Sequence, residues 1–318
     1  MFFLCSVMKN RWAVDKPLSR TAFAAKFPDN AACARHLISL RWPKGFVCPH
    51  CPSRKGWELK TKPFTFECAV CGKQTSVTAG TVMHRSKLPL LTWFQAVHIL
   101  TSHSNGISAE QAMAQLGIGS YKTAWLLLMK LRRAMKNPAR SLLSGIAEVD
   151  ETEVPLRSVR DPAAGYGIPN VGAMLISGAV EISPEGHPQR IRLEPLADKT
   201  GPNVRGFVER NVAKGTTVIS DGLASYKSLE GYKHTGRTVG PFPAHVFLPW
   251  IHRVFSNLKR WFMGTLHGVR KPYLKHYLNE FTFRWNRRRC TAPAFDRLLG
   301  FAAAQSHASA LDFVTCAA

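Results

Sequence analysis

The sequence predicts an α/β fold in which a mixed β-sheet flanked by helices follows two small amino-terminal modules. Residues 145–221 show apolar patterns in the order strand, strand, strand, helix, strand. Two close cysteine pairs precede them within residues 48–71, and two helical patterns joined by a Gly-containing turn lie between. With 318 residues, of which 45% are hydrophobic, the chain can bury one sizeable core plus one or two small modules.

The net charge indicates a polyanionic partner. Lys and Arg number 43 against 20 Asp and Glu, and the excess of +23 is spread along the chain. A nucleic acid is therefore the expected partner, with a membrane surface as the weaker alternative. No apolar run approaches membrane-spanning length. Residues 1–8 are apolar but lack a preceding basic region and a following cleavage signal, so we expect no signal peptide and a cytoplasmic protein.

Residues 30–85 carry the most specific local signal, after an extension of unassigned role over residues 1–29. Two Cys-x-x-Cys pairs, separated by 16 residues, can place four thiolates on one tetrahedral zinc ion. Four thiolates leave no position open for water, so this zinc is predicted to be structural. Short alternating segments beside the pairs complete the pattern of a zinc ribbon. The four predicted ligands are Cys48, Cys51, Cys68 and Cys71.

Residues 86–140 predict a helix-turn-helix. A helix over 90–103 is followed by the capping box Ser108-Ala-Glu-Gln111, a turn at 117–120 and a further helix over 121–136. In this motif the start of the second helix approaches base edges and its end faces phosphates, although a plain helical hairpin without DNA contacts has the same periodicity. The predicted DNA-binding residues are Ser120, Tyr121, Lys122 and Thr123 at the start, with Arg132 and Arg133 at the end.

Residues 141–300 predict a catalytic domain of the RNase H-like fold. Asp150 closes the first strand pattern and Asp221 closes the fourth. Carboxylates at these positions can share two divalent ions, which neutralise charge on the attacking and leaving oxygens of a phosphodiester. Hard oxygen donors favour Mg²⁺, with Mn²⁺ able to substitute. Strand alternation points Glu151 away from the side that bears Asp150, which predicts a structural or supporting role.

A third ligand is expected from the helix over 251–262. His252 lies seven residues before Lys259, within about 20° of the same helix face, whereas Asn257 lies nearly opposite Lys259. A metal ligand and a phosphate-binding Lys on one face favour His252 as the first choice. Asn257 is the second choice, because 35 residues separate it from Asp221, the more familiar spacing.

The sequence resembles the bacterial insertion-sequence transposases of the DDE superfamily that carry a zinc ribbon. The motifs are the two cysteine pairs, Glu148-Val-Asp-Glu-Thr152, Ser220-Asp221-Gly-x-x-Ser-Tyr226 and His252-Arg-Val-Phe-Ser-Asn-Leu-Lys-Arg260, with Tyr277 to Asn286 as a closing helix. The resemblance implies Mg²⁺-dependent cutting and joining of transposon ends by Asp150, Asp221 and Lys259. The superfamily's third Glu is absent from this helix, and His252 stands in its place relative to Lys259.

The resemblance also implies double-stranded DNA as the partner, with its phosphates near Arg253 and Arg260. It further implies Glu280 as support for the site, and a homo-oligomer that pairs two DNA ends in the bacterial nucleoid. Two other functions fit the same sequence. One is a non-catalytic DNA-binding regulator that uses the ribbon and the helix-turn-helix. The other is an RNA-processing nuclease. Residues 301–318, rich in Ala and Ser, carry no functional signal.

Overall fold

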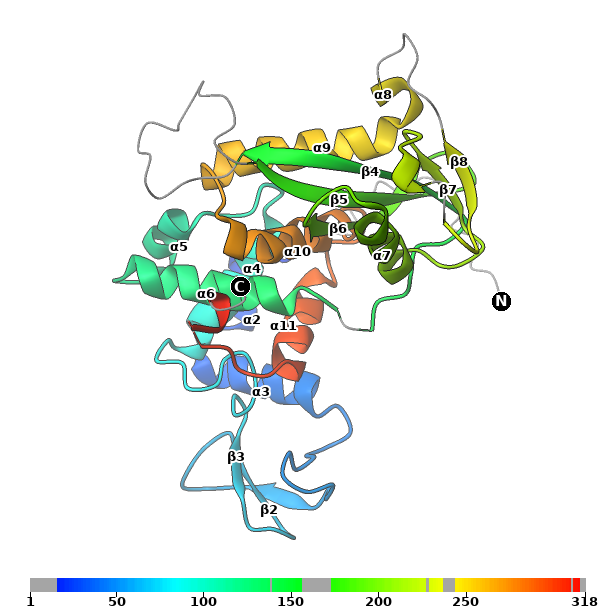
Figure 1. The fold of residues 1–318 in the computed structure, drawn as a ribbon. Coiled ribbons are helices and arrows are strands. Elements are labelled where there is room, and N and C mark those ends of the chain that lie inside the picture. The colour runs from blue at the N-terminus through cyan, green and yellow to red at the C-terminus, as the bar shows by residue number, and fades with distance from the viewer. Residues whose placement is uncertain are drawn as a thin grey trace. The chain divides into compact units, whose positions relative to one another are not determined.

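The computed structural model describes residues 16–137, 139–155, 173–226, 229–236, 244–309 and 311–314; the expectation for residues 1–8 lies outside these ranges. The chain forms two compact units (Figure 1). The first unit comprises Met1–Met135 and Arg287–Ala310, and the second comprises Lys136–Asn286 and Leu311–Ala318.

The first unit combines a helical core with the zinc-ribbon segment. Its core contains the buried side chains of Trp93, Phe94 and Leu100, and the rings of Phe27 and Phe295 pack against Phe94. Ser108 and Gln111 form the predicted capping box, and Gly117 ends that helix in the left-handed region at φ 62°. The helices are α2 (Arg20–Lys26), α3 (Asn30–Arg41), α4 (Leu90–Ser102), α5 (Ala109–Leu116), α6 (Tyr121–Ala134) and α11 (Ala294–Ala304).

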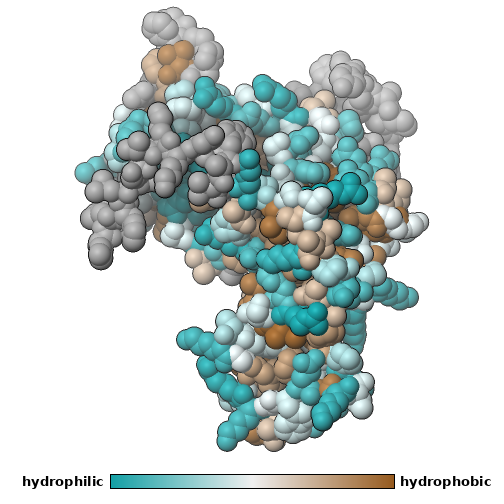
Figure 2. Space-filling model, turned by 180° about the vertical axis from the view of Figure 1, so that it is seen from behind, coloured by the Kyte–Doolittle hydropathy of each residue, from teal (hydrophilic) through white to brown (hydrophobic). Residues whose placement is uncertain are grey.

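The ribbon segment is a three-stranded antiparallel sheet in the order β1-β2-β3. One side of it packs on a small aromatic cluster: Phe46 stacks on Phe66 with ring centroids 5.2 Å apart, and Trp42 meets both rings edge-on. Figure 2 shows many hydrophilic residues on the visible face of this segment, at the lower end of the view. The strands are β1 (Gly56–Glu58), β2 (Thr65–Cys68) and β3 (Gln74–Ser76).

The second unit is built on a five-stranded sheet in the order β6-β5-β4-β7-β8. The pairs β4·β5 and β5·β6 are antiparallel, so the first three strands form the predicted meander, whereas β7 runs parallel to β4 and β8 runs parallel to β7. This mixed sheet with flanking helices is the predicted RNase H-like fold. The strands are β4 (Ile146–Pro155), β5 (Ala173–Ile182), β6 (Pro188–Leu196), β7 (Thr217–Ser220) and β8 (Lys233–Gly236).

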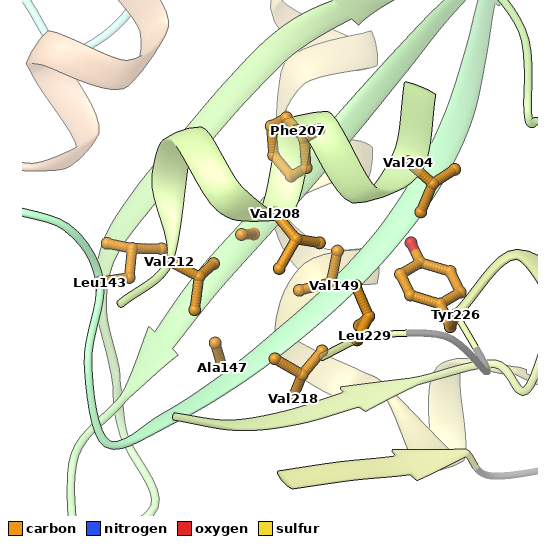
Figure 3. Packing of buried hydrophobic residues seen from close by; sticks show 11 residues of the cluster. Leu143, Ala147, Val149, Val204, Phe207, Val208, Val212, Val218, Tyr226 and Leu229 are labelled. Atoms are coloured by element: carbon orange, nitrogen blue, oxygen red, sulfur yellow. The ribbon is translucent and has the colours of Figure 1, made fainter. Parts of the chain in front are cut away.

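The two faces of the sheet are covered by α7 (Gly201–Asn211) and α9 (Pro249–Trp261). Figure 3 shows the core under α7, where Val208 lies next to Val149 from β4. On the other face, α9 lies so close to β5 that a Cβ atom added at Gly178 would come within 2.7 Å of the Phe255 ring. A larger residue at this position would push the helix away from the sheet.

The remaining helices of the second unit follow or precede α9. The side chain of Asn286 accepts a hydrogen bond from the Ile191 N–H and donates one to the Ile191 carbonyl, which ties the end of α10 to β6. Glu280 is fully buried on α10 and forms an ion pair with Arg284. The elements are η1 (Ala224–Tyr226), α8 (Ala244–Phe247), η2 (Phe262–Leu266), η3 (Lys271–Tyr273), α10 (Leu274–Trp285) and α12 (Leu311–Val314).

Three features differ from the sequence-based expectation. Asp150 was expected to close the first strand, but it lies in the middle of β4, because β5 pairs with β4 as far as Pro155. The catalytic module was expected to extend to residue 300, but α11 belongs to the first unit, where it packs against α3, α4 and α6. The short strand β8 was not expected, because its sequence, Lys-His-Thr-Gly, has no apolar alternation. Among the described helices, none is both long and apolar enough to cross a membrane.

Candidate active site and metal centre

The four cysteines of the ribbon lie together at a spacing that suits a tetrahedral metal. All four sulfur atoms lie within 4.8 Å of one another. Cys48 Sγ is 3.7 Å from Cys71 Sγ, and Cys51 Sγ is 3.5 Å from Cys68 Sγ. Four sulfurs at about 2.3 Å from a central zinc would be separated by about 3.8 Å, so the cluster fits that ion closely. Backbone N–H groups of Cys71 and Val70 lower the pKa of the Cys68 thiol, whereas burial and hydrogen bonds with the other three cysteines raise the pKa of the Cys51 thiol.

The predicted DNA-reading end of the helix-turn-helix lies at the protein surface. Ser120 precedes α6, and Tyr121, Lys122 and Thr123 form its first turn; all four are exposed. Their contact with DNA stays a prediction. This surface is compatible with it.

Arg132 requires a correction. The sequence placed it at the phosphate-facing end of α6, but its side chain is 0% exposed and its guanidinium donates a hydrogen bond to the Ile107 carbonyl. A buried side chain cannot reach a phosphate in this fold. The reason is that α4, α5 and α11 all pack against α6, so the helix buries more than the single stripe that its periodicity suggests. Arg133 is only partly buried and keeps the predicted role as a proposal.

In the second unit, strand β4 presents different carboxylates to the two faces of the sheet. Glu148 and Asp150 face α9, whereas Ala147, Val149 and Glu151 face the core under α7. This alternation follows from the pleat of the strand. Glu151 therefore points away from α9, as the sequence predicted.

Glu148 caps the helix that carries the third candidate ligand. One oxygen of its carboxylate accepts hydrogen bonds from the N–H groups of Trp250 at 2.9 Å and Ile251 at 2.8 Å. These N–H groups have no partner within the first turn of α9, and the positive end of the helix dipole favours a carboxylate there. Glu148 thus fixes the start of α9 against the middle of the sheet.

Asp150 and Asp221 follow the paired parts of two neighbouring parallel strands. The register of β4 and β7 ends at Glu148↔Ile219, so each aspartate lies two residues beyond this last pair. Burial raises the pKa of Asp150 to about 7, and the negative charges of Glu151 and Asp221 add to the increase, while Lys199 opposes it. The site therefore gathers carboxylates whose repulsion a cation would offset.

His252 is the candidate third ligand that the structure brings to Asp150. Its Nε2 lies 3.4 Å from Asp150 Oδ2. Asn257 lies more than one helical turn further along α9, and within the described residues no hydrogen bond or ion pair links it to either aspartate. Lys259 is exposed on nearly the same face as His252. Arg253 and Arg260 are also exposed, and Arg253 stacks on the Trp250 ring at 4.8 Å.

The carboxylate centre is more open than the cysteine cluster. In the part of the chain that the structure describes, the four cysteines are the only group of three or more His, Cys, Asp or Glu ligand atoms that all lie within 4.8 Å of one another. Asp150, Asp221 and His252 do not form such a close group. Metal-assisted phosphodiester chemistry requires positions on the ion for water and substrate oxygens, which a closed set of four ligands does not leave.

Two family models match the sequence. Residues 28–74 match a transposase zinc-ribbon domain, and residues 142–286 match an ISXO2-like transposase domain; together the two segments span more than half of the chain. The chain belongs to the insertion-sequence DDE transposases with a zinc ribbon. The matched segment of the transposase domain contains Asp150, Asp221, His252 and Lys259. It ends at Asn286, which is also the last residue of the long segment of the second compact unit.

Among solved structures, the transposase is similar to a chain of the cryo-EM structure of the simian T-cell lymphotropic virus intasome in complex with PP2A regulatory subunit B56 gamma. The identity is 14% and the TM-score is 0.28, and the match covers 53% of this chain and 63% of that chain. This TM-score is too low to establish a common fold, so the fold assignment rests on the strand order and the family match. No curated protein matches the sequence.

Three residues near the transposase's carboxylates were not selected from the sequence. Glu148 could have been found, because it shares a strand face with Asp150. Lys199 precedes α7 in a loop and lowers the pKa of both Asp150 and Glu151, which places its charge within reach of the site. Tyr226 donates a short hydrogen bond to Glu151. Tyr226 closes the motif Ser220-Asp221-Gly-x-x-Ser-Tyr226, but nothing in the sequence pairs it with Glu151. Lys199 lies in no motif, and only the fold brings it near β4.

Proposed function

We propose that this transposase binds the ends of its own insertion sequence and catalyses divalent-metal-dependent DNA strand cleavage and strand transfer. The observation that supports the proposal most strongly is the position of His252, whose imidazole lies 3.4 Å from Asp150, together with the charge of Asp221, which helps to raise the pKa of Asp150. Asp150 and Asp221 each lie two residues beyond the last residues paired between β4 and β7, and Glu148 caps the helix that carries His252. The fully buried core on the other side of β4 holds this strand in place.

The carboxylates of Asp150 and Asp221 and the imidazole of His252 would hold Mg²⁺ ions, two of them if the site follows the usual chemistry of DNA strand transfer. Their fit rests on the donor set, hard carboxylate oxygens plus one imidazole, and on the like charges that surround Asp150. When bound, such ions neutralise charge on the attacking and leaving oxygens of the scissile phosphate. Mn²⁺ has the same ligand preferences and would substitute.

The other functional side chains would bind and orient DNA. The helix that carries His252, α9, also carries three exposed basic residues, Arg253, Lys259 and Arg260. They can pair with phosphates on either side of the scissile bond. In the first unit, the exposed start of α6 would read the end sequence in the major groove. The zinc ribbon would add basic surface. A homo-oligomer would then bring two bound ends together in the bacterial cytoplasm, on the nucleoid.

The test is cleavage of DNA that carries the element's own terminal inverted repeats, in the presence of Mg²⁺ or Mn²⁺. Nicked ends and joined products are expected with the native chain and not with Asp150→Asn or Asp221→Asn. Glu209→Gln, an exposed α7 substitution, is the matched control and should retain activity. DNA binding without cleavage by the native chain would support the non-catalytic regulator instead. Preferential cleavage of structured RNA would support an RNA-processing nuclease.

A further inference from the structure

The turn that carries Asp221 is not attached to β4 by backbone pairing. Pairing between β4 and β7 stops at Glu148↔Ile219, and β7 itself ends at Ser220. Asp150 and Asp221 both lie beyond that point, where two carboxylates on adjacent strands repel each other. Something other than the strand ladder must therefore hold Asp221 beside Asp150.

A buried side-chain contact bridges this gap. The hydroxyl of Tyr226, five residues after Asp221, donates a short hydrogen bond to Glu151 Oε1, one residue after Asp150. Tyr226 is 0% exposed, and Figure 3 shows its ring among the apolar side chains of the core under α7. Burial raises the pKa of Tyr226 well above its usual range, so the phenol stays a donor. The other Glu151 oxygen is buried and has no hydrogen-bond partner among the described residues.

The remainder of the turn is fastened at several further points. Ser220 Oγ lies 2.9 Å from His234 Nε2, whose ring stacks on Tyr226. Asp221 Oδ1 accepts a hydrogen bond from the Leu223 N–H at 3.1 Å. The Ser225 hydroxyl donates to the Lys199 carbonyl at 2.7 Å. These contacts hold the turn in shape but do not reach β4. Among the described residues, Tyr226 is the one residue of the turn whose side chain forms a hydrogen bond with β4.

We propose that Tyr226 and Glu151 form a clasp that positions Asp221 opposite Asp150 for binding of a divalent cation. The clasp replaces the strand ladder where the ladder ends. It also keeps Glu151 on the far face of β4, so Glu151 acts as a positioning residue and not as a ligand. The proposal rests on the proposed function, because it assumes that the two aspartates share a cation.

The test is Mn²⁺ binding to the zinc-loaded full-length chain, followed by the electron paramagnetic resonance signal of free Mn²⁺. Tyr226→Phe removes only the hydroxyl and is expected to weaken Mn²⁺ binding by about 10-fold or more, the usual cost of losing a group that orients a ligand. Tyr232→Phe is the matched control: it removes another hydroxyl of the same unit, which donates to the Val212 carbonyl, and should leave Mn²⁺ affinity unchanged. Equal affinities for Tyr226→Phe and the native chain would overturn the clasp.

Two substitutions of Glu151 separate positioning from direct ligation. Glu151→Gln keeps an oxygen that can accept from Tyr226 and should retain most of the Mn²⁺ affinity, whereas Glu151→Ala should lose as much as Tyr226→Phe. If Glu151→Gln is as damaging as Glu151→Ala, the charge of Glu151 binds the ion and the clasp is wrong. If Mn²⁺ binding is insensitive to Asp150→Asn and Asp221→Asn as well, the proposed function fails together with the clasp.

Discussion

The cysteine cluster and the carboxylate centre hold their ligands in opposite ways. In the ribbon, four sulfurs from two short sequence motifs already lie at the separations of a zinc tetrahedron. In the second unit, the candidate ligands come from two strands and a helix, lie further apart, and include a buried aspartate whose pKa is raised to about 7. A closed set of thiolates stabilises a small module, whereas an open set of carboxylates stores repulsion that a catalytic ion can relieve.

Because of this difference, removing a ligand should change the stability of the two units in opposite directions. Loss of a cysteine removes a bond on which a small sheet depends. Loss of an aspartate removes a buried charge that costs stability until a metal arrives.

The largest effect is expected from Cys48→Ser. The ribbon has three strands of three or four residues and one small aromatic cluster, so it should lose its fold with its zinc. Zinc content by mass spectrometry and proteolysis within residues 42–76 would measure this. Cys290→Ser, which removes an exposed free cysteine, should retain both. A Cys48→Ser ribbon that stays protected from protease without zinc would contradict the prediction.

In the absence of Mg²⁺, Asp150→Asn is expected to make the second unit more stable. The pKa of Asp150 rises from 3.8 to about 7 on folding, so the folded chain retains a proton that the unfolded chain releases between those pH values. Stability therefore falls as the pH rises through this window, and above pH 7 the ionised carboxylate imposes its full cost.

At pH 8 the substitution should raise the free energy of unfolding of the second unit by about 2–4 kcal/mol, an upper range for a shift of this size. At pH 4 the gain should largely vanish. Urea unfolding at both pH values would measure it, with Glu209→Gln as the surface control. If the aspartate form is the more stable one at pH 8 without metal, Asp150 is not a strained buried acid.

A smaller effect separates the two candidates on α9. His252→Ala should reduce Mn²⁺-dependent cleavage by at least about 10-fold, because it removes the imidazole that lies 3.4 Å from Asp150. Asn257→Ala should change the rate much less. Single-turnover cleavage at saturating DNA would compare them. The reverse ranking would transfer the ligand role to Asn257.

Glu148→Ala should destabilise the second unit by about 1–2 kcal/mol, since it leaves the N–H groups of Trp250 and Ile251 without their acceptor. Glu148→Gln keeps an acceptor oxygen and should cost less. Thermal unfolding would rank the two variants. Equal stability of Glu148→Ala and the native chain would show that water replaces the cap at no cost.

The smallest effect is expected at the surface of the first unit. Lys122→Ala should weaken DNA binding uniformly across sequences and reduce the slope of log affinity against log salt by about 1. Lys122→Arg keeps the charge and should preserve the slope. Fluorescence anisotropy over a range of salt concentrations would measure both. An unchanged slope for Lys122→Ala would remove this residue from the DNA surface.

The same contrast explains how much the sequence could predict. The cysteine ligands lie in two Cys-x-x-Cys pairs separated by 16 residues, and this spacing alone predicts the site. The order of strands and helices from β4 to β7 follows from apolar alternation, and Asp221 could be selected because it directly follows β7. Asp150 was selected as the residue that closes the first strand, but it lies in the middle of β4, which continues to Pro155. The pairing of Tyr226 with Glu151 joins residues 75 positions apart, and no local pattern reports it.

The burial of Arg132 and the position of α11 were missed for the same reason. Periodicity indicates one apolar stripe on α6, but three other helices surround it. One of them, α11, comes from the far side of the catalytic sequence. The predictions that failed are therefore those that depend on contacts between distant segments of the chain.

The return of α11 to the first unit makes most of the second unit, Lys136–Asn286, an insertion within the sequence of the first. During synthesis, residues 1–135 leave the ribosome first, but Phe295, Leu298 and Leu299, which are buried on α11, follow only after the whole catalytic sheet has been translated. The nascent first unit therefore exposes an unfilled apolar face to chaperones for the time needed to add more than 150 residues.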